Sequence, residues 1–66
     1  MSLKYKVMGE NGTCGKAVYL EDAIYIAERN AKMFGGRWIV VRMKDGKVVW
    51  RPGMSYEEAL RECRRR

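Results

Sequence analysis

The hydrophobic positions change their period along the 66 residues, and the changes divide the chain into six predicted elements. Residues 4–8 alternate between apolar and charged side chains, which predicts a strand with Lys4 and Lys6 on its polar face. Residues 9–15 are rich in glycine and asparagine, so they are predicted to form a turn. Residues 16–19 then complete an N-terminal hairpin as a short second strand.

A helical period of 3.6 replaces the alternation between residues 20 and 34. The apolar side chains of this segment share one stripe: Leu20, Ala23, Ile24, Ala27, Ala31 and Phe34. Glu21 and Asp22 fall in the first turn, where the helix dipole favours acids, and the glycines at 35–36 provide a stop. We therefore predict a helix over residues 20–34.

Alternation returns over residues 37–44, and Asp45-Gly46 is typical of a two-residue type I′ hairpin turn. Such a turn would pair Met43 with Val48, Arg42 with Val49 and Val41 with Trp50. In this register, the core face consists of Ile39, Val41, Met43, Val48 and Trp50. The opposite face consists of Trp38, Val40, Arg42, Lys44, Lys47, Val49 and Arg51.

A second helix is predicted to begin after Ser55, because Ser55 and Glu58 form a capping-box pair. Its narrow apolar stripe contains Tyr56, Ala59, Leu60 and Cys63. The resulting ββαββα order predicts one small α+β domain over residues 1–66, an antiparallel sheet with helices packed on one face. The C-terminal arginines 64–66 are expected to form a frayed tail.

The composition restricts the chemistry that this domain can perform. The chain has no histidine, and Cys14 and Cys63 are too far apart for a Cys-x-x-Cys pair, which excludes a zinc finger or a thioredoxin-like site. No reaction class can be assembled, so we expect no catalytic residues, no cofactor and no metal. A signal peptide and a membrane-spanning segment are absent from the sequence pattern, so we expect a cytoplasmic protein without a membrane partner.

The net charge of +6 makes nucleic acid or another acidic macromolecule the leading expected partner. The basic residues concentrate in the predicted strands, so an open sheet face is the candidate surface. On this hypothesis Trp38 stacks on a base while neighbouring cations hold phosphates. The candidate site residues are Lys4, Lys6, Trp38, Val40, Arg42, Lys44, Lys47, Val49 and Arg51.

An alternative interpretation rests on the apolar members of the same face. Trp38, Val40 and Val49 would form an exposed apolar strip, and such strips often mark an interface. The domain would then be a structural or regulatory protein whose sheet face forms a homodimer or binds a protein partner.

Overall fold

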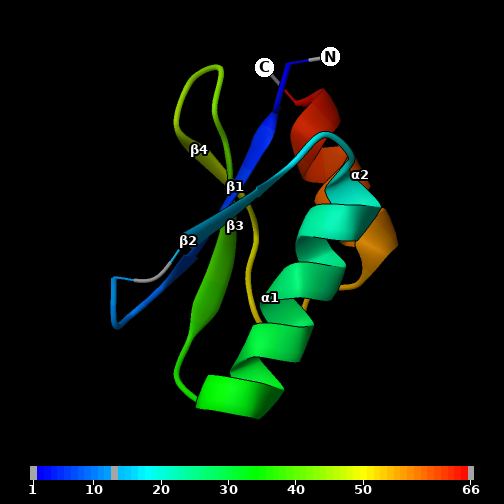
Figure 1. Ribbon diagram of the computed structural model, residues 1–66. Coiled ribbons are helices and arrows are strands. Elements are labelled where there is room, and N and C mark those ends of the chain that lie inside the picture. The colour runs from blue at the N-terminus through cyan, green and yellow to red at the C-terminus, as the bar shows by residue number, and fades with distance from the viewer. Residues whose placement is uncertain (1, 13, 66) are drawn as a thin grey trace.

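The computed structural model describes residues 2–12 and 14–65, and it confirms the predicted α+β class and ββαββα order (Figure 1). The elements are β1 (Tyr5–Gly9), β2 (Cys14–Ala17), α1 (Leu20–Phe34), β3 (Trp38–Arg42), β4 (Lys47–Trp50) and α2 (Tyr56–Arg64). The four strands form one antiparallel sheet in the order β2-β1-β3-β4. Neither helix of the described chain combines the length and apolar character needed to cross a bilayer.

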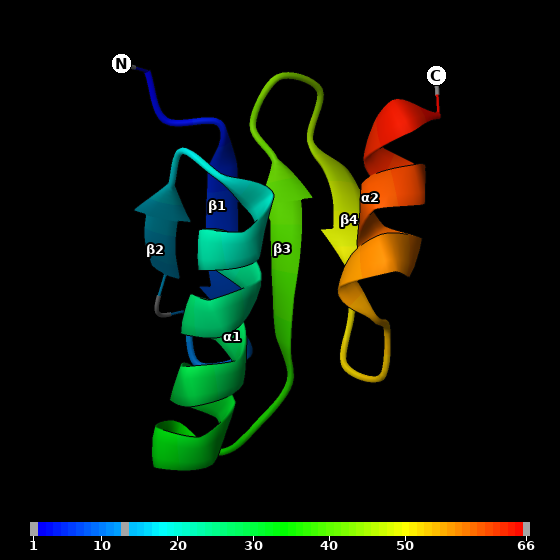
Figure 2. The ribbon, with the colours of Figure 1, turned by 90° about the vertical axis from the view of Figure 1, so that its right-hand side faces the viewer.

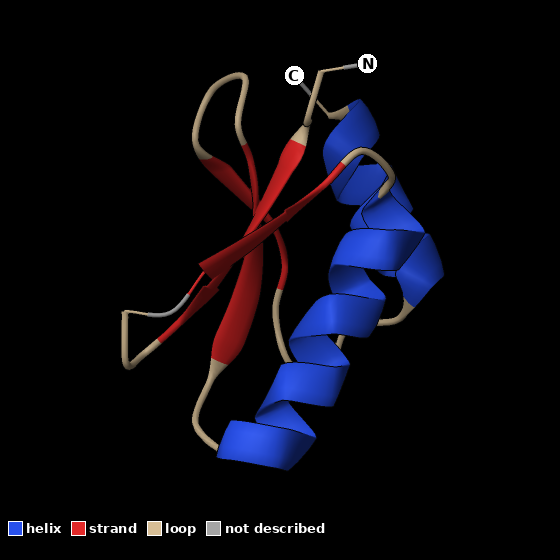
Figure 3. Ribbon diagram, in the orientation of Figure 1, coloured by secondary structure: helices blue, strands red, loops and turns tan. Residues whose placement is uncertain are grey.

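Both helices lie on the same side of the sheet, whose strands are seen nearly edge-on in Figure 3. Figure 2 shows α1 in front of β1 and the neighbouring strands, whereas α2 lies beside β4 at the opposite edge. We call the side that carries the helices the covered face and the other side the open face. No element of the described ranges packs on the open face.

Helix α1 has the predicted bounds, and four positions of its predicted stripe, Leu20, Ala23, Ile24 and Ala27, are buried. The stripe is less buried toward its C-terminal end, where Phe34 is 61% exposed and Ala31 is half-buried. Gly35 ends the helix at a positive φ of 71°, and its N–H donates to the carbonyl of Ala31 at 2.9 Å. This confirms the predicted glycine stop.

Helix α2 begins with the predicted capping box. The hydroxyl of Ser55 accepts from the Glu58 N–H at 3.1 Å, and the Glu58 carboxylate accepts from the Ser55 N–H at 3.0 Å. Arg64 is the last residue of α2, and the Arg65 guanidinium lies 3.3 Å from the Glu62 carboxylate. The rest of the predicted frayed tail, Arg66, falls outside the described residues.

The N-terminal hairpin differs modestly from its prediction. Strand β1 continues one residue further than expected, to Gly9, and β2 begins two residues earlier than expected, at Cys14. The predicted turn over residues 9–15 is therefore shorter, and Thr13 within it lies outside the described residues.

The predicted register of the second hairpin is wrong. The structure pairs Arg42 with Lys47 and Val41 with Val48. The connection spans the four residues 43–46 instead of two, and Gly46, at φ 74°, donates its N–H to the carbonyl of Arg42 at 2.8 Å. The carboxylate of Asp45 stabilises this four-residue connection by accepting a hydrogen bond from the backbone N–H of Lys47.

A β-bulge between the pairs Val41–Val48 and Val40–Trp50 adds Val49 as an extra residue on β4. Bulged residues break the two-residue alternation of a strand, so Val49 and Trp50 are both buried on the covered face. Val40 is also completely buried. The shift by two residues leaves the division of β3 into two faces unchanged. The helices cover the face of Trp38 and Val40, whereas the sequence prediction places the core on the face of Ile39 and Val41.

Trp38 anchors this arrangement from the covered face, where it is only 1% exposed. It pairs with Gly9 on β1, and a Cβ atom on Gly9 would lie 2.8 Å from three atoms of the indole. The indole N–H donates to the carbonyl of Gly35 at 2.9 Å. Gly9 thus leaves space for the indole of Trp38, and the carbonyl of Gly35 at the end of α1 accepts the hydrogen bond of the buried indole N–H.

Candidate functional site: the open face of the sheet

Three of the residues nominated from the sequence belong to the core. Trp38, Val40 and Val49 are all buried, so their predicted exposure is wrong. The pairing is shifted by two residues, which leaves the three on one face of the sheet, as predicted. They are buried because the helices cover that face and not the opposite one. Stacking of a base on Trp38 would require the core to open.

Two nominated cations, Arg42 and Lys47, point to the covered side and bind the C-terminal end of α2. Arg42 donates to the carbonyl of Cys63 at 2.5 Å, and the Lys47 ammonium donates to that of Glu62 at 3.1 Å. Cations are favourable at a helix C-terminus, where carbonyls lack helical partners. The two side chains therefore dock α2 against the sheet, and they do not join the predicted binding surface.

Asp45 holds Arg42 in this position. Its carboxylate accepts from Arg42 Nε at 3.0 Å and from Nη2 at 2.7 Å. These bonds, together with the bond from the Lys47 N–H, lower the pKa of Asp45 to about 2. On the same side, burial and a hydrogen bond from the Cys63 thiol raise the pKa of the Tyr5 hydroxyl.

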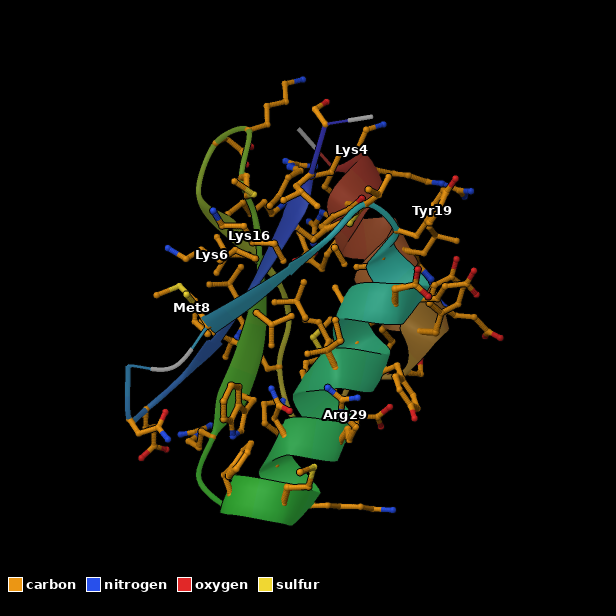
Figure 4. All side chains as sticks on the ribbon, in the orientation of Figure 1. Lys4, Lys6, Met8, Lys16, Tyr19 and Arg29 are labelled. Carbon is orange, nitrogen blue, oxygen red and sulfur yellow. The ribbon has the colours of Figure 1, made fainter. Side chains whose placement is uncertain are left out.

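The remaining nominated residues keep solvent contact. Lys6 lies on the open face, where Figure 4 shows it pointing away from the helices together with Lys16 and Met8, while Tyr19 and Arg29 lie on the helix side. Lys4 is exposed just before β1, Lys44 is exposed in the turn, and Arg51 is exposed directly after β4.

The centre of the open face is aliphatic. Met8 pairs with Ile39 across β1 and β3, and Val41 pairs with Val48 across β3 and β4. Directly opposed residues share a face of an antiparallel sheet, and Val41 is also opposed to Lys6. Since Figure 4 shows Lys6 and Met8 on the same side, Ile39, Val41 and Val48 belong to that side too. Met8 is 40% exposed, and the other three are half-buried. We call these four residues the aliphatic strip.

A pair of lysines borders the strip. Lys6 is the direct cross-strand partner of Lys16 on β2, and on its other side it pairs with Val41. Like charges directly opposite each other destabilise a sheet. Within the described chain, neither ammonium forms an ion pair, because the ion pairs found there join Arg42 to Asp45 and Arg65 to Glu62. The lysine pair is thus an uncompensated positive charge on the open face.

Two arginines border the strip at its other end. Arg37 and Arg51 line a shallow hollow whose floor includes Met8, Ile39 and Val48. Glu10 also lines this hollow, and its carboxylate accepts from the backbone N–H of Arg37 at 3.0 Å. The open face therefore combines an aliphatic centre with lysines at one end and arginines at the other.

The sequence pattern identifies Lys6 and Arg51 but not most of this face: Met8, Lys16, Arg37, Ile39, Val41 and Val48. The position of Met8 is predictable from the sequence, because Met8 follows Lys6 by two residues in an alternating strand. The exposed face of β3 is not predictable in this way, because the residues of both faces are apolar: Trp38, Ile39, Val40 and Val41.

Comparison with known proteins found no matching family model, no similar curated protein and no similar solved structure.

Proposed function

We propose that this protein is a non-enzymatic binding module whose open face holds an acidic macromolecule. The observation that carries the proposal is the pairing of Lys6 with Lys16 beside the exposed aliphatic strip. Both features are unfavourable in isolation: the ammonium groups repel each other and the strip remains in contact with water. A partner with negative charge and some apolar surface would relieve both.

The total charge supports the same direction. The chain carries 14 basic and 8 acidic side chains, so long-range attraction favours encounter with a polyanion. A polyanion attracted in this way would bind at the open face, because four basic side chains border it: Lys6, Lys16, Arg37 and Arg51. Glu10 is the acidic side chain that lines the same hollow as the arginines.

Self-association through this face is the weaker candidate. An isologous dimer places the same patch of both copies in contact. Two open faces would bring two lysine pairs and two arginine pairs into one interface, and like charges brought together oppose association.

The proposal is tested by comparing two variants that each lose two positive charges. Lys6→Gln with Lys16→Gln alters the open face, whereas Arg29→Gln with Lys32→Gln alters the exposed side of α1. Binding is measured by fluorescence anisotropy against polyglutamate and against a mixed-sequence single-stranded oligonucleotide, each over a range of salt concentrations.

We expect the open-face variant to bind at least one of the two polyanions about tenfold more weakly, and the α1 variant to bind like the wild type. For the oligonucleotide, loss of two phosphate contacts should make the log–log salt slope shallower by about 1.4. Equal weakening by the two variants would mean that only the net charge is attractive and would overturn the proposal. Sedimentation of the wild type and of the open-face variant shows whether the same face self-associates: an oligomer whose stability the variant changes would also contradict the proposal.

A further inference from the structure

We propose that the partner of the open face is an acidic amphipathic helix of another protein rather than a nucleic acid. This inference rests on the proposed function and adds the class of the partner. It follows from three properties of the face: its size, the kind of apolar side chain at its centre, and the spacing of its cationic groups.

The size of the face suits a single helix. Four strands about 4.8 Å apart, two of five residues and two of four, at about 3.3 Å per residue give a projected area of roughly 300 Å². A stable protein interface buries about 800 Å² per partner, which is more than this face presents. One helix, about 10 Å wide with its side chains, covers the aliphatic strip and leaves the basic residues at its sides.

The centre of the face suits side chains rather than bases. Single-stranded nucleic acid is held by aromatic side chains that stack on the bases. The aromatic residues of the described chain lie in the core, on the covered side, on the helices or in the connection before α1: Tyr5, Tyr19, Tyr25, Phe34, Trp38, Trp50 and Tyr56. The open face offers Met8, Ile39, Val41 and Val48 instead, and such surfaces pack against aliphatic side chains.

The charges are spaced for a helix that runs along the strands. Lys6 on β1 and Glu10, the residue after its end, are four residues apart, which corresponds to about 13 Å of extended chain. Arg37 lies beside Glu10, because the Glu10 N–H donates to the Arg37 carbonyl at 3.2 Å. About nine helical residues span the same length at a rise of 1.5 Å per residue. Acids near both ends of such a segment reach the lysine pair and the arginines, while its apolar stripe covers the strip.

The probe is a designed amphipathic helical peptide of 16 residues, with a leucine stripe and with glutamates nine positions apart beside it. A second peptide carries glutamine in place of these glutamates, and a mixed-sequence single-stranded oligonucleotide is the competing ligand. Each is titrated against the full chain under reducing conditions, which keep Cys14 and Cys63 as thiols.

The discriminating variant is Val41→Thr with Val48→Thr. The two residues face each other across β3 and β4, and threonine keeps the β-branched shape while replacing one methyl group with a hydroxyl. Circular dichroism and thermal melting confirm that the variant is folded before it is titrated.

We expect the acidic peptide to bind the wild type, and the threonine pair to raise its Kd about tenfold, the effect of two buried methyl groups. The glutamine peptide should bind at least tenfold more weakly. Tighter binding of the oligonucleotide, unchanged by the threonine pair but lost in Lys6→Gln with Lys16→Gln, would overturn the helix inference and leave the proposed function standing. Acidic-peptide binding that the lysine variant leaves unchanged would overturn both.

Discussion

The two faces of β3 carry almost the same kind of side chain, yet the fold treats them differently. Trp38 and Val40 point to the covered face and are completely or nearly completely buried, whereas Ile39 and Val41 point to the open face and stay half-buried. The difference comes from the helices, which cover only one side of the sheet (Figure 3). Similar apolar content thus stabilises the fold on one face and remains in contact with solvent on the other.

The polar groups show the same contrast. On the covered face the indole N–H groups of Trp38 and Trp50 and the cations of Arg42 and Lys47 all have acceptors within the chain. On the open face Lys6 faces Lys16. A domain of this size has a small stability margin, and the repulsion between these lysines reduces it further. The proposed binding of an acidic macromolecule gives this unfavourable pair a role.

The largest effect is expected from a charge on the covered side. Ala27 on α1 is completely buried, and Ala27→Asp would place an unpaired carboxylate in the core. We expect a loss of about 3–5 kcal/mol in the free energy of unfolding, enough to unfold most of the protein. The control Tyr25→Asp changes an exposed position of the same helix and can pair with Arg29. Equal thermal melting of the two variants would show that this stripe of α1 is not core.

The next effect separates two strand glycines. In Gly9→Ala the new methyl group meets the buried Trp38 indole at 2.8 Å, whereas in Gly15→Ala it meets a methyl carbon of Ile26 at an ordinary 3.6 Å. We expect Gly9→Ala to lower the free energy of unfolding by about 1–3 kcal/mol. Gly15→Ala should be neutral or slightly stabilising. Urea denaturation measures both, and a neutral Gly9→Ala would contradict the burial of Trp38 against this strand.

Acid should weaken the hairpin that docks α2. The pKa of Asp45 is lowered from 3.8 in the unfolded chain to about 2 in the folded one, so the folded protein favours the ionised form. The stabilisation is therefore present above about pH 4 and is lost as the pH falls toward 2. Urea denaturation between pH 6 and 2 should show a smaller loss for Asp45→Asn than for the wild type. Parallel curves for the two proteins would mean that the bonds to Arg42 and Lys47 do not stabilise the folded state.

The smallest effect is expected on the open face and has the opposite sign. Lys16→Glu replaces a repulsive cross-strand pair with an attractive one, so the free energy of unfolding should rise by about 0.2–1 kcal/mol. Binding of the acidic peptide should weaken at the same time. A variant that loses stability would show that the repulsion between Lys6 and Lys16 is not felt in solution.

The sequence predicts the element order and both helices well. Helix α1 has a 15-residue helical period that ends at a glycine, and α2 begins with a capping box. It does not predict the register of the second hairpin. Asp45-Gly46 fits a two-residue turn and a four-residue loop equally, and the bulge at Val49 has no sequence signature. The candidate site depends instead on which face of β3 the helices cover, and apolar residues occupy both faces of that strand. The pattern therefore predicts the position of Lys6 on β1 correctly but assigns Trp38 to the surface instead of the core.

One pair of variants tests the division between the two faces most directly. Val40→Thr and Val41→Thr make the same chemical change at adjacent positions of β3, one completely buried and one half-buried. We predict that Val40→Thr lowers the free energy of unfolding by about 1–3 kcal/mol, because its hydroxyl enters the core. Val41→Thr should change it by no more than about 0.5 kcal/mol. A larger loss in Val41→Thr than in Val40→Thr would contradict the assignment of the covered and open faces of β3 and, with it, the open face proposed as the binding surface.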